Sequence, residues 1–459
     1  MILTKYKLGD ILDVTRGASL SGEFYATKGE YIRLTCGNFD YQNNCFKENK
    51  SKDNLYYVGD FKPEFLMEEG DIITPLTEQA IGLLGSTAII PESGKYIQSQ
   101  DVAKIICNED LLDKDFAFYL ISSALVKQQL SAAAQQTKIR HTSPDKIKDC
   151  TVWIPELSEQ KRIGKLLRSI DRKIELNRAI NQNLEAMAKQ LYDYWFVQFD
   201  FPNEEGKPYK SSGGEMVWNE KLKRNMPKEW CAMTIGEVEN NIITGKTPSC
   251  ADEDNFGGDI PFITIDDIRG NLFVFNSQRT LSTKGAESQT KKYLPSGSLS
   301  VSCIGTIGVM GFIAKLSQTN QQINSIVFEN EHNREFVYFA LKLYFENAKA
   351  KTGNVFANMS KDEFASIKVV YSPKQILQEF HNKVVAIFDN IKNNIDEINA
   401  LTKQRDELLP LLMNGQAMVN SDLLACILSY ILISVYRNLG IISFAGNLPI
   451  NTKTTISRL

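Results

Sequence analysis

Two heptad-patterned segments of this chain, residues 163–195 and 380–412, match each other position for position. Alternating four- and three-residue steps keep their core positions on one face of a helix. The core positions of the first segment are Ile163, Leu167, Ile170, Ile174, Asn177, Asn181, Leu184, Ala188, Leu191 and Trp195. Those of the second are Phe380, Val384, Ile387, Ile391, Asn394, Ile398, Leu401, Arg405, Leu408 and Leu412. A seam this long cannot be buried by its own helix, so each segment predicts a long helix that needs a partner.

Each heptad segment follows a globular stretch, and the two stretches, residues 6–155 and 230–373, resemble each other. Ile81-Gly82-Leu83-Leu84-Gly85 is matched by Ile304-Gly305-Thr306-Ile307-Gly308, and the polar run 98–100 before a strand-like stretch is matched by 320–322. We interpret the chain as a tandem duplication of a globule followed by a long helix. A length of 459 residues suits two domains with connecting structure.

Local patterns predict both strands and helices within each globule. Residues 31–34 and 261–265 are strand-like, whereas residues 115–134 and 334–350 have helical periodicity. Ser143 and Ser360 are predicted N-caps of short helices. Because strands and helices interleave irregularly, the sequence indicates an α+β fold.

The spacing of the repeats predicts how the two long helices pair. The first would be roughly 48 Å long at about 1.5 Å per residue. Only a short linker follows it, so the second helix is expected to return antiparallel. Asn177 and Asn394 occupy the same seam position near the middle of each helix, where polar residues discourage slipped registers, and an antiparallel pair would bring them close. The alternative is that each amphipathic helix packs only on its own globule.

These patterns divide the chain into six parts. They are a first globule at 1–155, a first spacer helix at 156–198, a linker at 199–229, a second globule at 230–373, a second spacer helix at 374–417 and an apolar tail at 418–459. The tail has no charge between residues 423 and 436, but about fourteen apolar residues are too few to span a bilayer. We expect it to form an extra helix or to be poorly ordered.

Composition adds few constraints on function. With 52 basic and 55 acidic residues the formal net charge is −3, which excludes a chain coated in positive charge but not a local basic surface. The eight cysteines show no C-x-x-C pair, so we expect reduced, structural thiols. The N-terminus lacks a signal-peptide pattern, which predicts a cytoplasmic protein.

The chain shows no catalytic constellation. Gly245-Lys246-Thr247 resembles the end of a phosphate-binding loop, but Asn240 stands where that loop needs glycine. Asp200, Glu205 and Lys207 resemble the residue set of a metal-dependent nuclease, but they lie in the expected linker, where a flexible loop cannot fix a metal. Three scattered histidines offer no metal-ligand spacing, and no Asn-Pro-Pro-aromatic or Asp-Pro-Pro-aromatic tetrapeptide of amino-methyltransferases occurs.

The ordered pattern of globule, long helix, globule and long helix resembles the specificity subunits of bacterial type I restriction-modification enzymes. The resemblance covers roughly residues 1–417 and is carried most strongly by 257–266, 304–308, 320–324 and 155–160, together with the connecting stretch 201–209. It implies that each globule is a target-recognition domain for one half of a split DNA sequence. The helices would fix the spacing between the halves and dock modification subunits.

The resemblance also implies where the chemistry of such a complex resides. Two methyltransferase subunits using S-adenosylmethionine, and restriction subunits using ATP and Mg, are the expected partners beside double-stranded DNA. This chain itself is expected to bind no cofactor or metal, to lack catalytic residues and to require no membrane.

Loops rich in Arg, Lys, Gln, Asn and Thr are the candidate DNA contacts, because phosphates and base edges are read by such side chains. In the first globule the candidates are Arg16, Arg33, Gln98, Gln100, Lys138, Arg140 and His141. In the second they are Lys246, Thr247, Arg269, Lys291, Lys292, Gln321, Gln322 and Asn354. For each, the alternative is a solvated side chain or a bond that orders a loop, and the glutamines could bond strand ends.

The sequence leaves two other functions open. One is a coiled-coil scaffold that joins two protein-binding globules without touching DNA. The other is a self-sufficient nuclease or methyltransferase, which would require a catalytic constellation.

Overall fold

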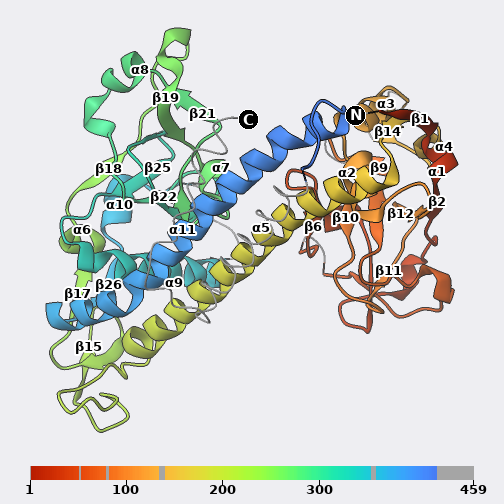
Figure 1. The fold of residues 1–459 in the computed structure, drawn as a ribbon. Coiled ribbons are helices and arrows are strands. Elements are labelled where there is room, and N and C mark those ends of the chain that lie inside the picture. The colour runs from red at the N-terminus through yellow and green to blue at the C-terminus, as the bar shows by residue number, and fades with distance from the viewer. Residues whose placement is uncertain (1, 51–52, 79–81, 134–139, 353–357, 421–459) are drawn as a thin grey trace. The chain divides into compact units, whose positions relative to one another are not determined.

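The computed structural model describes residues 2–50, 53–78, 82–133, 140–352 and 358–420 (Figure 1). The chain divides into two compact units: unit 1 holds residues 1–174 and those from 400 onward, and unit 2 holds residues 175–399. The division runs through both long helices, α5 (Leu157–Tyr192) and α11 (Lys374–Met413). Each unit therefore contains one globule and a segment of each helix.

Unit 1 is built around a four-stranded antiparallel sheet in the order β10-β8-β12-β2. Its strands are β2 (Leu12–Arg16), β8 (Ile72–Pro75), β10 (Ala88–Ile89) and β12 (Val102–Cys107). A second sheet has the order β11-β4-β7-β3, and three strand pairs, β1-β14, β13-β9 and β5-β6, complete the unit. These strands are β1 (Thr4–Lys7), β3 (Tyr25–Ala26), β4 (Tyr31–Arg33), β5 (Phe39–Asp40), β6 (Cys45–Phe46), β7 (Tyr56–Tyr57), β9 (Thr77–Glu78), β11 (Tyr96–Ile97), β13 (Arg140–His141) and β14 (Thr151–Ile154).

Four helices accompany these strands: α1 (Leu8–Ile11), α2 (Lys114–Ile121), α3 (Ala124–Ala133) and α4 (Pro144–Lys148). The helical pattern predicted over 115–134 is confirmed in the described residues, but it divides into α2 and α3 at Ser122 and Ser123. The Ser122 hydroxyl donates to the carbonyl oxygens of Phe118 and Tyr119 at 3.1 and 3.2 Å. Serine side chains compete in this way with the helical backbone bonds and favour helix ends.

Unit 2 is built around a five-stranded sheet in the order β18-β25-β22-β23-β20 and a three-stranded sheet in the order β21-β19-β24. The strands of these two sheets are β18 (Ile242–Thr244), β19 (Phe256–Ile263), β20 (Phe273–Val274), β21 (Arg279–Leu281), β22 (Leu299–Ser302), β23 (Met310–Ile313), β24 (Gln318–Thr319) and β25 (Ile323–Ile326). Two strand pairs join β15 (Met216–Asn219) to β16 (Arg224–Pro227) and β17 (Cys231–Thr234) to β26 (Lys368–Tyr371). The helices of the globule are α6 (Ile235–Val238), α7 (Ile265–Ile268), α8 (Thr283–Glu287), α9 (Arg334–Thr352) and α10 (Lys361–Ala365).

The two globules repeat one topology, as the duplicated motifs predict. The order β10-β8-β12-β2 in unit 1 corresponds to β23-β22-β25-β18 in unit 2. The pair β1-β14, which leads into α5, corresponds to β17-β26, which leads into α11. The predicted caps are also confirmed: the Ser143 hydroxyl accepts from the Lys146 amide, and the Ser360 hydroxyl accepts from the Glu363 amide. The α+β prediction is confirmed for both halves of the duplication.

The predicted seams are buried along much of both long helices. In unit 1 Ile163, Leu167, Ile170 and Ile174 are at most 3% exposed. The seam positions buried in unit 2 are Asn177, Ala188, Trp195, Phe380, Val384, Ile391 and Asn394. Seven further positions are half-buried, namely Asn181, Leu184, Leu191, Ile387, Ile398, Leu401 and Leu408. The first helix ends before Trp195, because α5 stops at Tyr192 and a π-helical turn, Asp193–Val197, follows.

Hydrogen bonds link α5 and α11 in both units, and the two bonds of unit 2 show that the helices run antiparallel there. In unit 1 Asp171 of α5 pairs with Arg405 of α11 at 2.8 Å. In unit 2 the side-chain amide of Asn394 donates to the side-chain oxygen of Asn181 at 2.8 Å, and the side-chain amide of Asn177 donates to the Glu397 carboxylate at 2.7 Å. The two central asparagines therefore bond to Asn181 and Glu397 rather than to each other. Their bonds still fix the register, since each links one helix to the other.

Residues 199–229, expected as a linker from their composition, are folded. Phe201 is 5% exposed, and its ring stacks on those of Tyr209 and Trp230 at centroid distances of 4.7 and 5.0 Å. The strands β15 and β16 form a hairpin in the same segment. Four aromatic residues that are spaced along the sequence provide this packing, namely Phe199, Phe201, Tyr209 and Trp230. The polar and glycine-rich composition of the segment therefore did not predict it.

Within the described ranges, no helix is both long enough and apolar enough to cross a bilayer. The predicted tail helix falls on residues 421–459, which lie outside the described residues. The candidate contacts Lys138 and Asn354 also lie outside them.

Candidate nucleic-acid interface

The polar candidates of unit 1 gather at one edge of its four-stranded sheet. Arg16 ends β2 and pairs with Ala103, next to the start of β12, while Pro75 ends β8 and pairs with Val102. The chain therefore leaves β2 and β8 and enters β12 at the same edge. Antiparallel pairing dictates this arrangement, because the end of one strand lies beside the start of its neighbour.

Hydrogen bonds join the end of β2 and the loop after it to the loop before β12. Nε of Arg16 donates to the carbonyl oxygen of Gln100 at 2.8 Å, and the Ala18 amide donates to that of Gln98 at 3.0 Å. A Cβ atom at Gly17 would lie 2.3 Å from the Gln98 oxygen, so this close approach requires glycine. The side chains of Arg16 and Gln100 remain exposed on the joined loops.

Strand β13 adds two more candidates to the same edge. Arg140 pairs with Glu78 and His141 with Thr77, the two residues of β9 that follow β8. The Thr77 hydroxyl lies 3.3 Å from Nδ1 of His141 and donates to the Asp101 carboxylate at 3.3 Å. The structure thus brings Arg16, Gln100, Arg140 and His141 to one edge, from three separate regions of the sequence.

Two candidates of unit 1 are instead buried within the globule. Gln98 is 1% exposed and donates to the carbonyl oxygens of Thr15 and Val102 at 2.8 and 3.1 Å. Arg33 is 7% exposed, and its guanidinium lies 3.8 Å from the ring centre of Tyr25. Gln98 therefore bonds strand ends, the alternative that its sequence context leaves open, and Arg33 supports the second sheet.

Unit 2 places its candidates at the equivalent sheet edge. Thr244 ends β18, Ile323 starts β25 and Ser302 ends β22. The loop after β18 carries exposed Lys246 and half-buried Thr247. The Thr247 hydroxyl donates to the side-chain oxygen of exposed Gln321 at 2.6 Å.

Residues 289–292 form further hydrogen bonds that order the loop after β18. Nζ of Lys292 donates to the carbonyl oxygen of Thr244 at 2.8 Å, and the side-chain amide of Gln289 donates to that of Lys246 at 2.8 Å. Lys291 is exposed in the same 3-10 turn as Lys292. The side-chain oxygen of Gln322 accepts from the Asn320 amide at 3.0 Å. Lys292 thus orders the loop, whereas Lys246 and Lys291 are exposed.

The glycine loop after β22 supplies the remaining part of this edge. Gly305 and Gly308 have φ values of +77° and +81°, a backbone conformation that favours glycine. Thr306, between them, is exposed and lies 3.5 Å from the guanidinium of Arg269. Arg269 also lies 3.7 Å from the Asp266 carboxylate.

Thr306 and Asn358 are exposed edge residues that the list of sequence candidates omits. Asn358 forms a backbone bridge with Ile304, as His141 pairs with Thr77 in unit 1. His141 and Asn358 are 217 residues apart, the offset that also relates Ile163 to Phe380. Asn358 can therefore be identified from the sequence, because the 217-residue offset of the long helices makes it the equivalent of His141.

The structure gives other roles to the two motifs that resemble catalytic sites. The Asp200 carboxylate accepts from the amide and hydroxyl of Ser211, both at 2.7 Å, and the hydroxyl bond lowers its pKa. The amide of Gly245 donates to Ile323 in a strand contact, and the chain beyond Thr247 continues to a 3-10 turn, Glu253–Asn255. Among the described residues, no group of three His, Cys, Asp or Glu side chains could hold a metal ion.

Comparison with protein families supplies the deciding observation. A model described as the type I restriction modification DNA specificity domain matches the chain twice, over residues 3–186 and 227–406. The chain belongs to this family. The two matches reproduce the duplication, and each ends within a long helix.

Individual members of the type I specificity family are similar over most of their length. The chain is 30% identical over 374 residues to the type I restriction enzyme HindI specificity subunit of Haemophilus influenzae, covering 70% of this chain and 81% of that protein. It is 22% identical over 333 residues to the MjaIX specificity subunit of Methanocaldococcus jannaschii, covering 68% and 71%.

A solved structure supports the fold. The type I restriction-modification system S subunit from M. genitalium matches with a TM-score of 0.56 at 16% identity, covering 90% of this chain and 96% of that chain. The likeness shows that the two share a fold.

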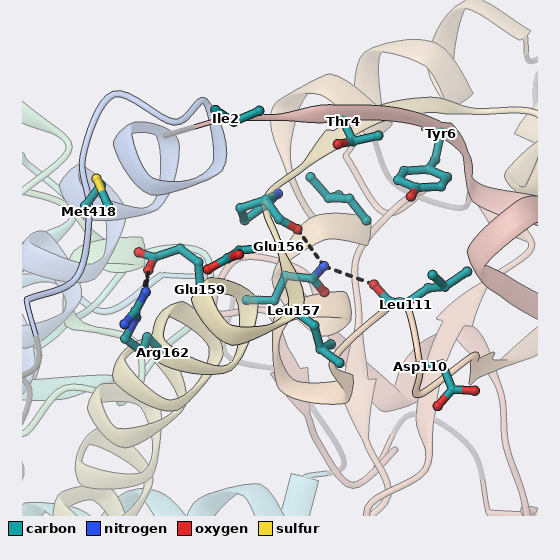
Figure 2. A pocket seen from close by; sticks show the side chains of 13 residues that line it. Ile2, Thr4, Tyr6, Asp110, Leu111, Glu156, Leu157, Glu159, Arg162 and Met418 are labelled. Atoms are coloured by element: carbon teal, nitrogen blue, oxygen red, sulfur yellow. Dashed lines mark hydrogen bonds and ion pairs between the residues drawn. The ribbon is translucent and has the colours of Figure 1, made fainter.

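Figure 2 shows a pocket of unit 1 where the start of α5 meets β1. Nε2 of Gln160 donates to the carbonyl oxygens of Leu111 and Pro155 at 3.0 and 2.9 Å. The Glu159 carboxylate pairs with Arg162 and accepts from the Val419 amide at 3.1 Å. These bonds connect the start of α5 to residues 111, 155 and 419 of the same unit.

Proposed function

We propose that this chain is the DNA-reading specificity subunit of a type I restriction-modification complex. Each globule would read one half of a bipartite target in duplex DNA. The observation that carries this proposal is the repeated sheet edge, which presents exposed amide, hydroxyl and cationic side chains at equivalent places in both units. Family membership supports the same role.

The side chains at these edges match the chemistry of DNA recognition. Glutamine can bond in a bidentate manner to adenine, arginine can do so to guanine, and lysine contacts phosphates. In unit 1 Arg16 and Gln100 would contribute such contacts, and in unit 2 Gln321 and Lys246 would do so. Arg33 and Gln98 are buried, so the proposal does not include them among the direct contacts.

The proposed subunit reads an address and carries out no chemistry itself. S-adenosylmethionine, ATP and Mg would be bound by partner subunits, namely two modification subunits and the restriction subunits. The long helices would dock the modification subunits and set the spacing between the half-sites. The complex would act in the cytoplasm, on chromosomal and incoming DNA.

A scaffold that joins two protein-binding globules is the competing function. It predicts no sequence-selective DNA binding after the partner subunits are added. The repeated polar edges favour DNA, because a protein-binding surface usually has an apolar centre.

Mapping modified adenines by single-molecule sequencing tests the proposal. Genomes from cells with the gene, without it and with it restored would be compared. We expect methylation at one bipartite motif to disappear with the gene and to return with its restoration. Unchanged methylation at every bipartite motif would contradict the proposal.

A further inference from the structure

A buried polar triad joins the first globule to both long helices in unit 1. The carboxylate of Asp171, on α5, accepts from the Tyr119 hydroxyl of α2 and from the Arg405 guanidinium of α11, the latter at 2.8 Å. The three residues are at most 8% exposed. Arg405 also pairs with the neighbouring Asp406 at 2.8 Å. The pair of Asp171 and Arg405 is thus a buried ionic contact between the two long helices.

The second copy of the repeat has apolar residues at the same three places. The helix offset of 217 residues makes Phe388 the equivalent of Asp171 and Ala188 the equivalent of Arg405, and the matched helices place Phe339 at Tyr119. All three belong to the core of unit 2 and are at most 1% exposed. The rings of Phe339 and Phe388 meet edge to face at a centroid distance of 5.9 Å. At these three positions one junction is therefore ionic and its repeat is hydrocarbon.

This difference has a consequence for helix pairing between two copies of the chain. If α5 paired antiparallel with a second α5, Asp171 would face Ala188, which is the α5 equivalent of Arg405. If α11 paired with a second α11, Arg405 would face Phe388. Either pairing would bury a charge opposite an apolar side chain, which is strongly unfavourable. The pairing of α5 with α11 matches charge with charge and hydrocarbon with hydrocarbon.

We propose that the Tyr119–Asp171–Arg405 triad selects the helix partner, so that α5 accepts α11 and rejects a second copy of α5. The duplication gives such a device a use, because the two helices share much of their seam pattern. Stability alone does not account for the triad, since the other junction achieves the same packing with apolar residues. Charged and polar seam residues are an established means of choosing coiled-coil partners.

Two full-length variants with complementary charges test this selection. The Arg405→Asp chain places two carboxylates at its own junction, and the Asp171→Arg chain places two guanidinium groups there. When co-expressed, the chains can exchange helices, so that Asp171 of the first chain meets Arg405 of the second and the two substituted side chains meet each other with opposite charges. We expect a 1:1 dimer, measured by native mass spectrometry and by capture through a tag on one chain.

A matched pair of variants controls for charge changes on the same helices. Arg172→Glu and Lys403→Glu alter exposed positions of α5 and α11. The junction variants should yield roughly tenfold more 1:1 dimer than this control, because each mispaired charge costs at least one factor of ten in equilibrium. Equal amounts of dimer from both pairs would overturn the proposal.

A single chain that carries both Asp171→Arg and Arg405→Asp distinguishes selection from failure to fold. It restores opposite charges within one molecule, so we expect a folded monomer. If this chain is monomeric while the co-expressed variants give no dimer, the junction does not direct pairing. If the reversed pair fails to restore the monomer, opposite charge is not what decides the pairing.

Discussion

Gln98 and Gln100 are two residues apart and have opposite environments. Gln98 turns into the globule and bonds Thr15 and Val102, whereas the side chain of Gln100 is exposed and its carbonyl oxygen accepts from Arg16. In unit 2 Gln321 and Lys246 have exposed side chains on adjoining loops. At the scale of single residues, exposure at the sheet edge separates side chains that can meet DNA from those that hold the loops.

Lys246→Ala should weaken DNA binding by the assembled complex to a similar extent for every sequence. An exposed ammonium group that contacts a phosphate releases a counterion, so the slope of log K against log salt should become less steep by about 0.9. Fluorescence anisotropy over a salt series measures both quantities. Lys223→Ala, on the β15-β16 hairpin, is the control. Equal salt slopes for the two variants would remove Lys246 from the interface.

Arg405→Ala should destabilise unit 1. Removing one partner of a buried ion pair costs about 3–5 kcal/mol, since the other charge remains buried. Hydrogen exchange of the α2 amides, compared with those of unit 2, measures the local loss. Lys403→Ala, at a side chain that is 77% exposed, should change the free energy of unfolding by less than about 0.5 kcal/mol. Similar exchange in the two variants would contradict the structural role of Arg405.

At the scale of elements, local signals were predictable and contacts between distant segments were not. Ser143 and Ser360 cap short helices as expected, because a cap depends on three or four consecutive residues. The long helices follow from their heptads for the same reason. In contrast, the guanidinium of buried Arg33 on β4 lies over the ring of Tyr25 on β3, and that contact depends on how the second sheet assembles, because β7 lies between the two strands.

The segment at 199–229 shows the same limit. Its glycines and prolines indicate a linker, yet its aromatic residues pack with Trp230 across intervening turns. The sheet edge that forms the candidate interface likewise could not be predicted from sequence patterns. Its residues Arg16, Gln100 and His141 meet only after β2, β12 and β13 have paired with their neighbouring strands. The duplication was the best guide, since its offset relates His141 to Asn358.

Phe201→Ala tests whether the 199–229 segment is part of the fold of unit 2. Truncating a buried phenylalanine costs about 3–5 kcal/mol, so the unfolding midpoint of unit 2 should fall clearly. Trp218→Ala removes a side chain that is 55% exposed in the same segment and should have a much smaller effect. Chemical denaturation monitored by aromatic fluorescence for Phe201→Ala, and by circular dichroism for both variants, makes the comparison. Equal effects would indicate a linker that contributes little to packing.

At the scale of the whole molecule, the duplication provides two reading edges and two helices. The topology of one globule is repeated in the other, while the edge side chains differ: Arg16 and Gln100 in unit 1, and Lys246 and Gln321 in unit 2. A shared scaffold with different edge residues suits a bipartite target whose halves differ in sequence. It also predicts that the two halves of the target can be altered independently.

The central claim, that each edge reads one half of a bipartite target, is tested by mapping modified adenines in cells that carry half-specific variants. One variant combines Arg16→Ala with Gln100→Ala, and the other combines Thr247→Ala with Gln321→Ala. We predict that each variant relaxes or abolishes recognition in one half of the motif, a different half for each, and leaves the other half and the spacing unchanged. Changes in both halves from either variant, or unchanged recognition by both, would contradict this account.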